Sequence, residues 1–277
     1  MIHVAAFSGG KDSTALLLHL RDANIEHETV FCDTGWEAQE TYDYIDYINE
    51  KILDGKLIVL KSEKYDGLED LAIKRKMFPN LRARFCTQEL KLKPLWAYFE
   101  SLDDEATNYQ GIRAEESAAR SNLRETEWVN EGGGYWVSRP LLQWSAEDVF
   151  AIHKKHGIEP NPLYLRGHSR VGCFPCIFAN QKDFKQVLRD HPETLDRIRD
   201  LEKAVNDAAN KPEAPRTFFR NDKIPEQYRS VKAVSKDGSA YRAGTVDDVA
   251  RYLLEADENQ LDMFPTPKCM SVYNLCE

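Results

Sequence analysis

The sequence predicts an α/β fold in which a mostly parallel sheet carries helices on both of its faces. Within the first 140 residues, short apolar runs alternate with longer segments in which apolar residues recur at helical spacing. Alternation of this kind is typical of parallel strands joined by helices that cover the sheet. The composition agrees, because 42% hydrophobic and 30% charged residues is an ordinary balance for a globular protein.

The expected elements follow in chain order. Residues 2–7 are expected to form a buried strand. Residues 14–23 are expected to form a helix, because Leu16, Leu17 and Leu20 make an apolar stripe. Further strands are expected at 27–32, 57–60 and 107–112, and further helices at 37–52, 67–76 and 88–100, the last opened or interrupted by Pro94.

The pattern changes after residue 140, and the rest of the chain is expected to be mainly helical. Ser145 is expected to cap a helix that ends at His156, because Glu147 and Asp148 lie in its first turn. The sequence thus predicts two domains, residues 1–140 and residues 141–277. Further helices are expected at 180–190, 192–209 and 247–255, loops at 159–172 and 211–244, and an irregular tail at the end.

Charge and hydropathy limit the classes of function. The formal net charge of the 277 residues is −9, which counts against a non-specific nucleic-acid coat protein. No apolar run approaches the roughly 20 residues that a membrane span needs. The first residues lead directly into a strand, with no basic segment and no cleavage site of signal type. We therefore expect a cytoplasmic protein with no membrane partner.

A local basic patch lies inside this acidic chain. Its residues fall within twenty positions, and Arg166, His168 and Arg170 follow in a later loop. Both groups suit a polyphosphate substrate such as DNA or tRNA. A solvated helix face with an adjoining loop is the alternative. The patch consists of Lys74, Arg75, Lys76, Arg82, Arg84, Lys91 and Lys93.

The first motif that indicates chemistry follows the expected strand 2–7 and opens the next helix. Its glycines let backbone N–H groups approach an anion closely, and the N–H groups at a helix start favour negative charge. Lys11 adds a cation. The spacing differs from the Gly-x4-Gly-Lys-Ser/Thr loop of common nucleotide triphosphatases, and a tight turn is the alternative. The motif is Ser8, Gly9, Gly10, Lys11, Asp12 and Ser13.

This motif, the SGGKDS loop, resembles the pyrophosphate-binding loop of the PP-loop ATP pyrophosphatases. Further segments resemble the branch of that superfamily that is similar to phosphoadenosine-phosphosulfate (PAPS) reductase. The resemblance implies the α/β fold of adenine-nucleotide alpha-hydrolases. It also implies cleavage of ATP between its α- and β-phosphates and adenylation of a substrate oxygen. The segments are Phe-Cys-Asp-Thr-Gly at 31–35, Arg-Phe-Cys-Thr at 84–87, Gly-Ile-Arg-Ala-Glu-Glu-Ser at 111–117 and Gly-Cys-Phe-Pro-Cys at 172–176.

The resemblance assigns further residues to an ATP site. Asp33 and Thr34 end an expected parallel strand, where open α/β sheets bind ligands, and Asp33 is expected to hold Mg²⁺ or the ribose. Gly111 and Arg113 follow the fourth strand, from which Arg113 and also Arg120 would reach phosphate. A helix N-cap is the alternative role for Asp33, and a surface salt bridge is the alternative for Arg120. The candidate catalytic residues are Lys11, Asp12 and Cys86.

The cysteines indicate a metal or redox role, because disulfide frameworks are rare in cytosolic chains of this size. Cys173 and Cys176 form a Cys-x-x-Cys pair that can bring two thiolates to one metal ion or cluster. The resemblance implies that Cys86 joins them around an iron–sulfur cluster, with Cys276 or Cys269, or no protein group, as the fourth ligand. A structural zinc site, a redox-active thiol pair and plain buried cysteines are the alternatives.

Other residues are expected to be structural. Cys32 lies in an apolar strand, where cysteine is commonly a core residue. His153 and His156 have the spacing of ligands on a helix, but a solvated helix end is the preferred interpretation. Packing near the sheet edge, with stacking on a nucleic-acid base as the alternative, is expected for Trp128, Trp136 and Trp144.

The leading hypothesis is an ATP pyrophosphatase that couples adenylation to sulfur transfer onto nucleic acid, as in DNA phosphorothioation or tRNA thiolation. Lys11 and Mg²⁺ would stabilise charge on the leaving pyrophosphate, and a sulfur species held by the cysteines would displace AMP. A sulfur-donor protein of the cysteine desulfurase type is the expected partner, and a homodimer is possible.

Two other functions stay open. A sulfonucleotide reductase, acting on PAPS or adenosine phosphosulfate through Cys276 or Cys86, is the first. The intact SGGKDS loop argues against it, as does a tail that lacks the glycine and basic residue of those reductases after its last cysteine. A non-catalytic ATP-binding subunit with structural zinc is the second.

Overall fold

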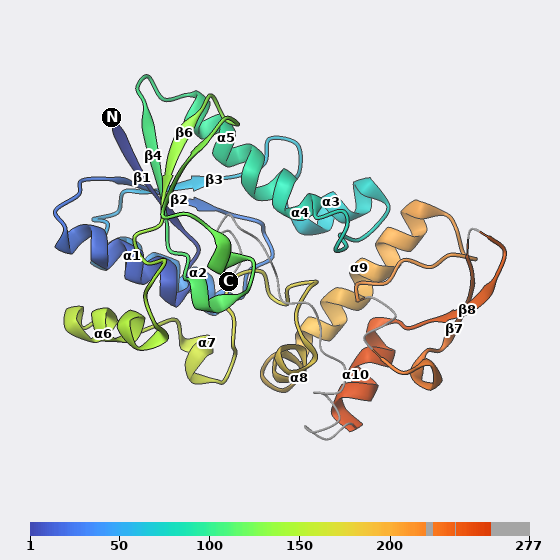
Figure 1. Cartoon of the computed structure of the whole chain (residues 1–277). Helices are drawn as coiled ribbons and strands as arrows, with labels where there is room; N and C mark the ends of the chain where they lie inside the picture. Colours follow the sequence, from blue (N-terminus) through green and yellow to red (C-terminus); the bar gives the residue numbers. More distant parts are fainter. Residues whose placement is uncertain (220–223, 236, 256–277) are drawn as a thin grey trace. The chain divides into compact units, whose positions relative to one another are not determined.

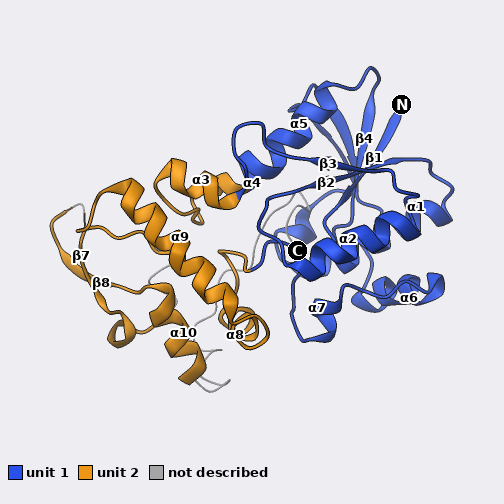
Figure 2. Ribbon diagram, turned by 180° about the vertical axis from the view of Figure 1, so that it is seen from behind, with its two compact units in different colours: residues 1–67, 87–174, 269–277 blue, residues 68–86, 175–268 orange. Residues whose placement is uncertain are grey.

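The computed structural model describes residues 1–219, 224–235 and 237–255. The chain divides into two compact units (Figure 2). Among the described residues, unit 1 comprises 1–67 and 87–174, and unit 2 comprises 68–86 and 175–255. The units alternate along the chain, so they divide it differently from the two stretches 1–140 and 141–277.

Unit 1 is built on a six-stranded sheet with the order β3-β2-β1-β4-β6-β5 (Figure 1). Its strands are β1 (Ile2–Phe7), β2 (Glu28–Cys32), β3 (Leu57–Leu60), β4 (Ala106–Gln110), β5 (Thr126–Val129) and β6 (Tyr135–Ser138). Neighbouring strands are parallel except at one edge, where β5 runs antiparallel to β6. The mostly parallel sheet expected from the sequence is confirmed.

Helices cover both faces of this sheet. Those of unit 1 include α1 (Lys11–Asp22), α2 (Gln39–Lys51), α5 (Lys93–Glu100), α6 (Ala146–His156) and α7 (Pro162–Leu165), with short turns η2 (Ala114–Glu116) and η3 (Arg120–Asn122). On one face, Phe7 of β1 shares an apolar core with Leu16 of α1 and Val149 of α6. On the other, Val4 of β1 shares a second core with Leu95 of α5. Figure 1 shows α1 and α5 on opposite sides of the sheet.

Pro94 marks the start of a helix. The chain passes through α4 (Phe85–Thr87) and a π-helical turn, η1 (Gln88–Leu92), into α5, where Pro94 occupies one of the first two positions. A proline fits there, because the first N–H groups of a helix have no partner within it.

The structure contains two strands, β5 and β6, that were not predicted from the sequence. Each has four residues, and β5 alternates between exposed and half-buried side chains, so it lacks an apolar run. Gly132, Gly133 and Gly134 join the two strands, all with positive φ. This hairpin adds an antiparallel edge to the parallel sheet.

Unit 2 is mainly helical, as expected for the C-terminal region. It contains α3 (Leu68–Arg75), α8 (Gln181–Asp190), α9 (Glu193–Ala209), α10 (Val246–Glu255) and the turn η5 (Glu226–Tyr228), around the buried rings of Phe184, Phe218 and Phe219. It also contains an antiparallel ribbon of β7 (Val231–Val234) and β8 (Ala240–Ala243). The expectation of loops throughout 211–244 is therefore wrong. Among the helices of the described ranges, none has the length and apolar character needed to cross a membrane.

Candidate nucleotide-binding site

The SGGKDS loop lies where the strand order of the sheet reverses. From β1, strands β2 and β3 continue on one side, whereas β4 and β6 lie on the other. Open α/β sheets bind ligands beyond the carboxyl ends of their strands at such a switch point. The loop follows β1, and Gly111 and Arg113 follow its neighbour β4. The fold therefore gathers these assigned residues at one edge of the sheet.

Two glycines let the chain turn from β1 into α1. Gly9 has a φ of +78°, in the left-handed region that L side chains rarely adopt. A Cβ at Gly9 would also lie 3.0 Å from Cγ2 of Thr41 and 3.2 Å from Cγ1 of Ile45. Gly10 is the N-cap of α1, and its carbonyl accepts the N–H of Thr14 at 3.0 Å. The loop is thus packed closely against α2.

The two serines of the loop hold its ends together. Oγ of Ser13 donates to the carbonyl of Gly10 at 3.0 Å and accepts the N–H of Ser8 at 3.2 Å. Oγ of Ser8 lies 3.0 Å from Oγ of Ser13. Both side chains are buried. These bonds fix the loop before any ligand arrives.

The buried loop carries backbone N–H groups that lack acceptors. Gly9, Gly10 and Asp12 are buried, and no hydrogen bond within the described residues uses their N–H groups. The N–H of Lys11 donates to the hydroxyl of Tyr164 at 3.3 Å. N–H groups at a helix start carry partial positive charge, and burying them without acceptors is destabilising. A bound anion would supply the missing acceptors.

Asp12 joins the two cations of the site. Nζ of Lys11 lies 2.7 Å from Oδ2 of Asp12, and Nε of Arg113 donates to Oδ1. The side chains of Asp12 and Arg113 are 0% and 5% exposed, against 15% for Lys11. Burial alone would lower the pKa of Arg113, but Asp12 and Glu115 raise it above its ordinary value. Lys11 is therefore the more accessible cation.

Arg120 forms a second buried pair. It donates to Oε2 of Glu116, and the same oxygen accepts the N–H of Arg113 at 2.9 Å. The side chain of Arg120 is 3% exposed. The salt bridge considered from the sequence therefore exists, but it is buried and fixes the turn after β4.

Gly111 lets β4 approach the start of α1. A Cβ at this position would lie 2.6 Å from the carbonyl oxygen of Asp12 and 3.1 Å from Cα of Ser13. Both are backbone atoms, which cannot rotate away as a flexible side chain would. The close approach of the two segments at the switch point therefore requires glycine.

Three side chains from the segment after β6 contact the SGGKDS loop. None of these three contacts was predicted from the sequence. Nδ2 of Asn161 donates to the carbonyl of Gly9 at 3.2 Å, and Nε2 of His153 donates to that of Lys11 at 2.8 Å. Tyr164 accepts the N–H of Lys11. Asn161 is 0% and His153 2% exposed, so the interpretation of His153 as a solvated helix end is wrong. An asparagine before a proline at 161–162 is the one local signal, because it is typical of a helix start.

Asp33 lies at the centre of a hydrogen-bonded turn after β2. Oδ1 accepts the N–H of Gly35 at 2.9 Å and the hydroxyl of Tyr42 at 2.7 Å, and Oδ2 lies 3.0 Å from Nζ of Lys61. Burial would raise the pKa of Asp33, but these bonds lower it below its ordinary value. The carboxylate is therefore ionised. Asp33 is not the N-cap of α2, a position that Ala38 occupies.

Thr34 connects this turn to the first cysteine of the Cys-x-x-Cys pair. Its hydroxyl donates to Oε1 of Glu37 at 2.6 Å and lies 3.7 Å from Sγ of Cys173. Glu37 and Cys173 also face each other in an isolated antiparallel bridge. The carbonyl of Trp36 accepts the N–H of Phe174 at 2.6 Å. The chain around Cys173 is thereby tied to the same edge of the sheet.

The metal centre assigned from the sequence stays a prediction. Within the described ranges, no group of three or more His, Cys, Asp and Glu side chains is arranged to hold a metal ion. Cys32 is a core residue as expected, and burial raises its pKa to about 12. The assigned cysteines are Cys173 in unit 1, Cys86 and Cys176 in unit 2, and Cys276 with its alternative Cys269 outside the described residues.

Many residues of the basic patch already have partners within the protein. The carboxylate partners of these residues and of Arg166, in the later loop, offset part of the positive charge that is open to a polyanion, whereas ring contacts do not. Contact with nucleic acid stays a prediction. Lys74 pairs with Asp70, Lys93 with Glu89 and Arg166 with Glu40, while Arg75 lies over the ring of Phe85 and Arg84 over that of Phe178.

Known proteins similar to this chain include viral, archaeal and bacterial relatives. An uncharacterized 37.8 kDa protein of Escherichia phage 186 is 32% identical over 337 aligned residues, which span the whole chain and 97% of the phage protein. An uncharacterized protein of Methanocaldococcus jannaschii is 29% identical across 83% of this chain and 54% of its own length. The adenosine 5′-phosphosulfate reductase of Streptomyces coelicolor is 32% identical over 152 residues, 54% of this chain and 61% of that enzyme.

The fold is shared with a solved structure, the phosphoadenylyl-sulfate (PAPS) reductase of Candida auris in its phosphate complex. The TM-score is 0.52 at 19% identity, over 64% of this chain and 83% of that one. Residues 2–179 match the model of the phosphoadenosine phosphosulfate reductase domain. That range contains all six strands of the sheet and the SGGKDS loop. The resemblance drawn from the motifs is thus confirmed, and the chain belongs to the phosphoadenosine phosphosulfate reductase domain family.

Proposed function

We propose that the chain binds ATP at the SGGKDS loop and transfers AMP to an oxygen of a second substrate, releasing pyrophosphate. The observation that carries this proposal is the set of buried N–H groups at Gly9, Gly10 and Asp12 that have no acceptor within the described residues. They lie at the positive end of the twelve-residue helix α1, which favours a phosphate anion.

In the proposed reaction, an acceptor oxygen attacks the α-phosphorus of ATP. A new phosphorus–oxygen bond forms there while the bond to the oxygen that bridges the α- and β-phosphates breaks. The electron pair of the broken bond stays on the leaving pyrophosphate, and a hydroxyl acceptor would release its proton to solvent. The loop N–H groups and Lys11 are positioned to stabilise the growing negative charge. Asp12 and Arg113 keep Lys11 oriented by the ion pairs described above.

The residues after β2 fit the Mg²⁺ that accompanies ATP. Asp33 supplies an ionised carboxylate, and Mg²⁺ in such sites is held by one or two carboxylates together with substrate phosphates. The ion would neutralise part of the charge on the pyrophosphate. For an iron–sulfur cluster, the described residues offer no set of three ligands.

The acceptor that we propose is nucleic acid, with sulfur then displacing AMP, as in DNA phosphorothioation or tRNA thiolation. The intact loop supports activation by ATP, and the attachment of Cys173 to the turn at Thr34 supports a cysteine that acts beside the nucleotide. A sulfur-donor protein of the cysteine desulfurase type would supply the sulfur as a persulfide, whose terminal sulfur bonds to the activated atom while the bond to AMP breaks. A cysteine thiol of the chain would then attack the donor's cysteine sulfur, breaking the sulfur–sulfur bond and forming a disulfide with the donor, so that this thiol supplies the two electrons. Cys86 is the other cysteine proposed to take part.

Release of pyrophosphate from ATP tests the first step. Purified chain incubated with Mg²⁺, α-labelled ATP and DNA or tRNA should release pyrophosphate and label the acceptor. Lys11→Ala should reduce the rate at least about a hundredfold, because it removes a charge that acts in the transition state. Lys155→Ala is the matched control, since Lys155 pairs with Asp22 on the surface of the same unit. Retention of the full rate in Lys11→Ala would refute the proposal.

A sulfonucleotide reductase is the second candidate. It is favoured by the similarity of this chain to the Streptomyces coelicolor adenosine 5′-phosphosulfate reductase over 54% of its length. Release of sulfite from adenosine phosphosulfate or PAPS, lost in Cys276→Ser, would favour this function. Tight binding of ATP with neither product would instead favour a non-catalytic subunit.

A further inference from the structure

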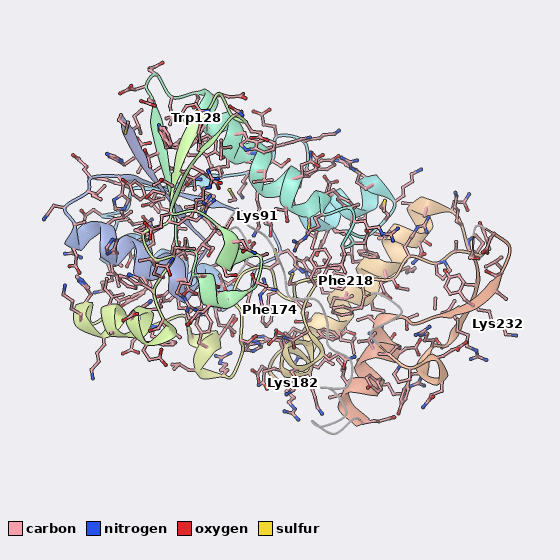
Figure 3. All side chains as sticks on the ribbon, in the orientation of Figure 1. Lys91, Trp128, Phe174, Lys182, Phe218 and Lys232 are labelled. Atoms are coloured by element: carbon pink, nitrogen blue, oxygen red, sulfur yellow. The ribbon has the colours of Figure 1, made fainter. Side chains whose placement is uncertain are left out.

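A row of paired positions crosses one face of the sheet and becomes exposed toward the β5 edge. His3, Thr107, Trp136 and Trp128 occupy directly paired positions on β1, β4, β6 and β5, and so share one face. We call these four residues the tryptophan row. Exposure increases toward the edge, from 8% at Thr107 to 41% at Trp136 and 45% at Trp128. Figure 3 labels Trp128 at the upper margin of the sheet.

The two indole rings are held in place without being buried. Nε1 of Trp136 donates to Oε1 of Glu105 and Nε1 of Trp128 donates to Oδ1 of Asn130, each at 3.0 Å. The rings meet edge to face, with centroids 5.5 Å apart. Neither ring belongs to the two apolar cores that pack against the sheet. Expected packing near the sheet edge is therefore incomplete, and the rings present apolar surface to solvent.

Glu105, which contacts Trp136, and two carboxylates close to the rings in the sequence make this stretch of the chain acidic. Asp103 and Glu105 precede β4, and Glu131 lies in the hairpin between β5 and β6; all three are exposed. No ion pair within the described residues neutralises these three carboxylates. The nearby amino group of Met1 is already paired with Asp104. The row thus combines fixed aromatic surface with uncompensated negative charge.

The negative charge near the tryptophan row excludes some of the partners that an exposed aromatic surface could bind. Nucleic acid and anionic membrane would be repelled. A second copy of the chain would bring the same carboxylates against each other across a two-fold axis. A cationic group would not be repelled, because guanidinium and ammonium groups are attracted both to carboxylates and to indole faces.

We propose that the tryptophan row is a docking site for a cationic segment of a partner protein, with arginine or lysine side chains over Trp128 and Trp136. The site is separate from the nucleotide loop. His3 and Ser8 are five residues apart on and after β1, a distance of roughly 16 Å along a strand. Docking would therefore leave the carboxyl edge of the sheet accessible to ATP.

Binding of a synthetic peptide that alternates arginine and glycine tests the proposal on the full chain. A peptide that alternates glutamate and glycine serves as its control. Calorimetry should detect binding of the arginine peptide alone, weaker at high salt. Trp128→Ala should raise its Kd about tenfold, the size of one cation–aromatic contact. Glu131→Gln, which leaves both rings intact, should raise the Kd about threefold.

Two variants on α6 are the matched controls. Phe150→Ala removes an aromatic ring with a similar exposure of 42%, and Glu147→Gln removes an exposed carboxylate; neither should change the Kd. Equal affinity of wild type and both test variants for the arginine peptide would overturn the proposal. So would self-association of the chain, or binding of a single-stranded oligonucleotide, that Trp128→Ala abolishes.

Discussion

Asp12 is the residue on which the charge balance of the loop depends. Its carboxylate is 0% exposed and lies between Lys11 and Arg113. Asp12→Asn would remove the buried carboxylate partner of Arg113, whose side chain is 5% exposed, and leave the exposed Glu115 as its ion-pair partner. Breaking a buried pair is strongly destabilising, so we expect the free energy of unfolding to fall by about 3 kcal/mol. Urea denaturation of both proteins measures the difference.

The control for this prediction is a surface pair in the same unit. Asp22 is 32% exposed and its partner Lys155 is 63% exposed. Solvent screens such a pair, so Asp22→Asn should change the free energy of unfolding much less than Asp12→Asn does. Equal losses in the two variants would show that burial of Asp12 does not matter.

Residues of the site differ in how far sequence could reveal them. The SGGKDS loop was predictable because six informative residues are contiguous and lie between an apolar run and a helical pattern. His153 and Asn161 were not, because 142 and 152 positions separate them from the loop residues that they contact. A single histidine or asparagine in a sequence does not indicate which distant backbone group its side chain will bind. Only the folded chain brings them together.

Secondary-structure elements also differ in how far the sequence could reveal them. Strands β1 to β3 were predictable because their sequences are mainly apolar. Strand β4 contains Thr107, Asn108 and Gln110, although four of its five residues are buried. Strands β5 to β8 have four residues each and expose alternate or most side chains. The edge strand β5 and the two-stranded ribbon of β7 and β8 need no apolar run, so periodicity does not reveal them. Strand β6 lies inside the sheet, but its four residues include only three apolar ones.

The cap of α6 supports a prediction at this scale. Oγ of Ser145 accepts the N–H of Asp148 at 3.1 Å, and Oδ2 of Asp148 accepts the N–H of Ser145 at 2.8 Å. Ser145→Ala removes an acceptor for an N–H group that has no partner within the helix. We expect a loss of about 1 kcal/mol in the free energy of unfolding, measured by chemical denaturation.

Ser145→Asp separates the cap from other effects of substitution at this position. Aspartate is as good an N-cap as serine, so this variant should keep most of the stability that Ser145→Ala loses. Because His153 of the same helix donates to the carbonyl of Lys11, Ser145→Ala should also weaken ATP binding. A loss of stability as large in Ser145→Asp as in Ser145→Ala would contradict the capping argument.

At the scale of the whole molecule, the stability of unit 2 should depend on pH. Glu202 of α9 is buried in unit 2, and its carboxylate accepts the N–H groups of Phe218 at 2.7 Å and Val246 at 3.1 Å. Burial is the main cause that raises its pKa from 4.5 to about 7; the two hydrogen bonds lower it, and the nearby Asp247 and Asp248 raise it by less. The folded unit therefore keeps a proton that the unfolded chain has already released.

The sign of the effect follows from this difference in bound protons. The contribution of Glu202 to stability is fully present below pH 4.5 and is lost as pH rises through about 7, a change of about 3 kcal/mol. Hydrogen exchange of the α9 and α10 amides, corrected for intrinsic rates, should show weaker protection at about pH 8 than at about pH 5. Glu202→Gln, which cannot ionise, should remove most of that dependence. Glu69→Gln, at a half-exposed position of the same unit, should keep this pH dependence. Unchanged pH dependence in Glu202→Gln would mean that another group of unit 2 holds the proton.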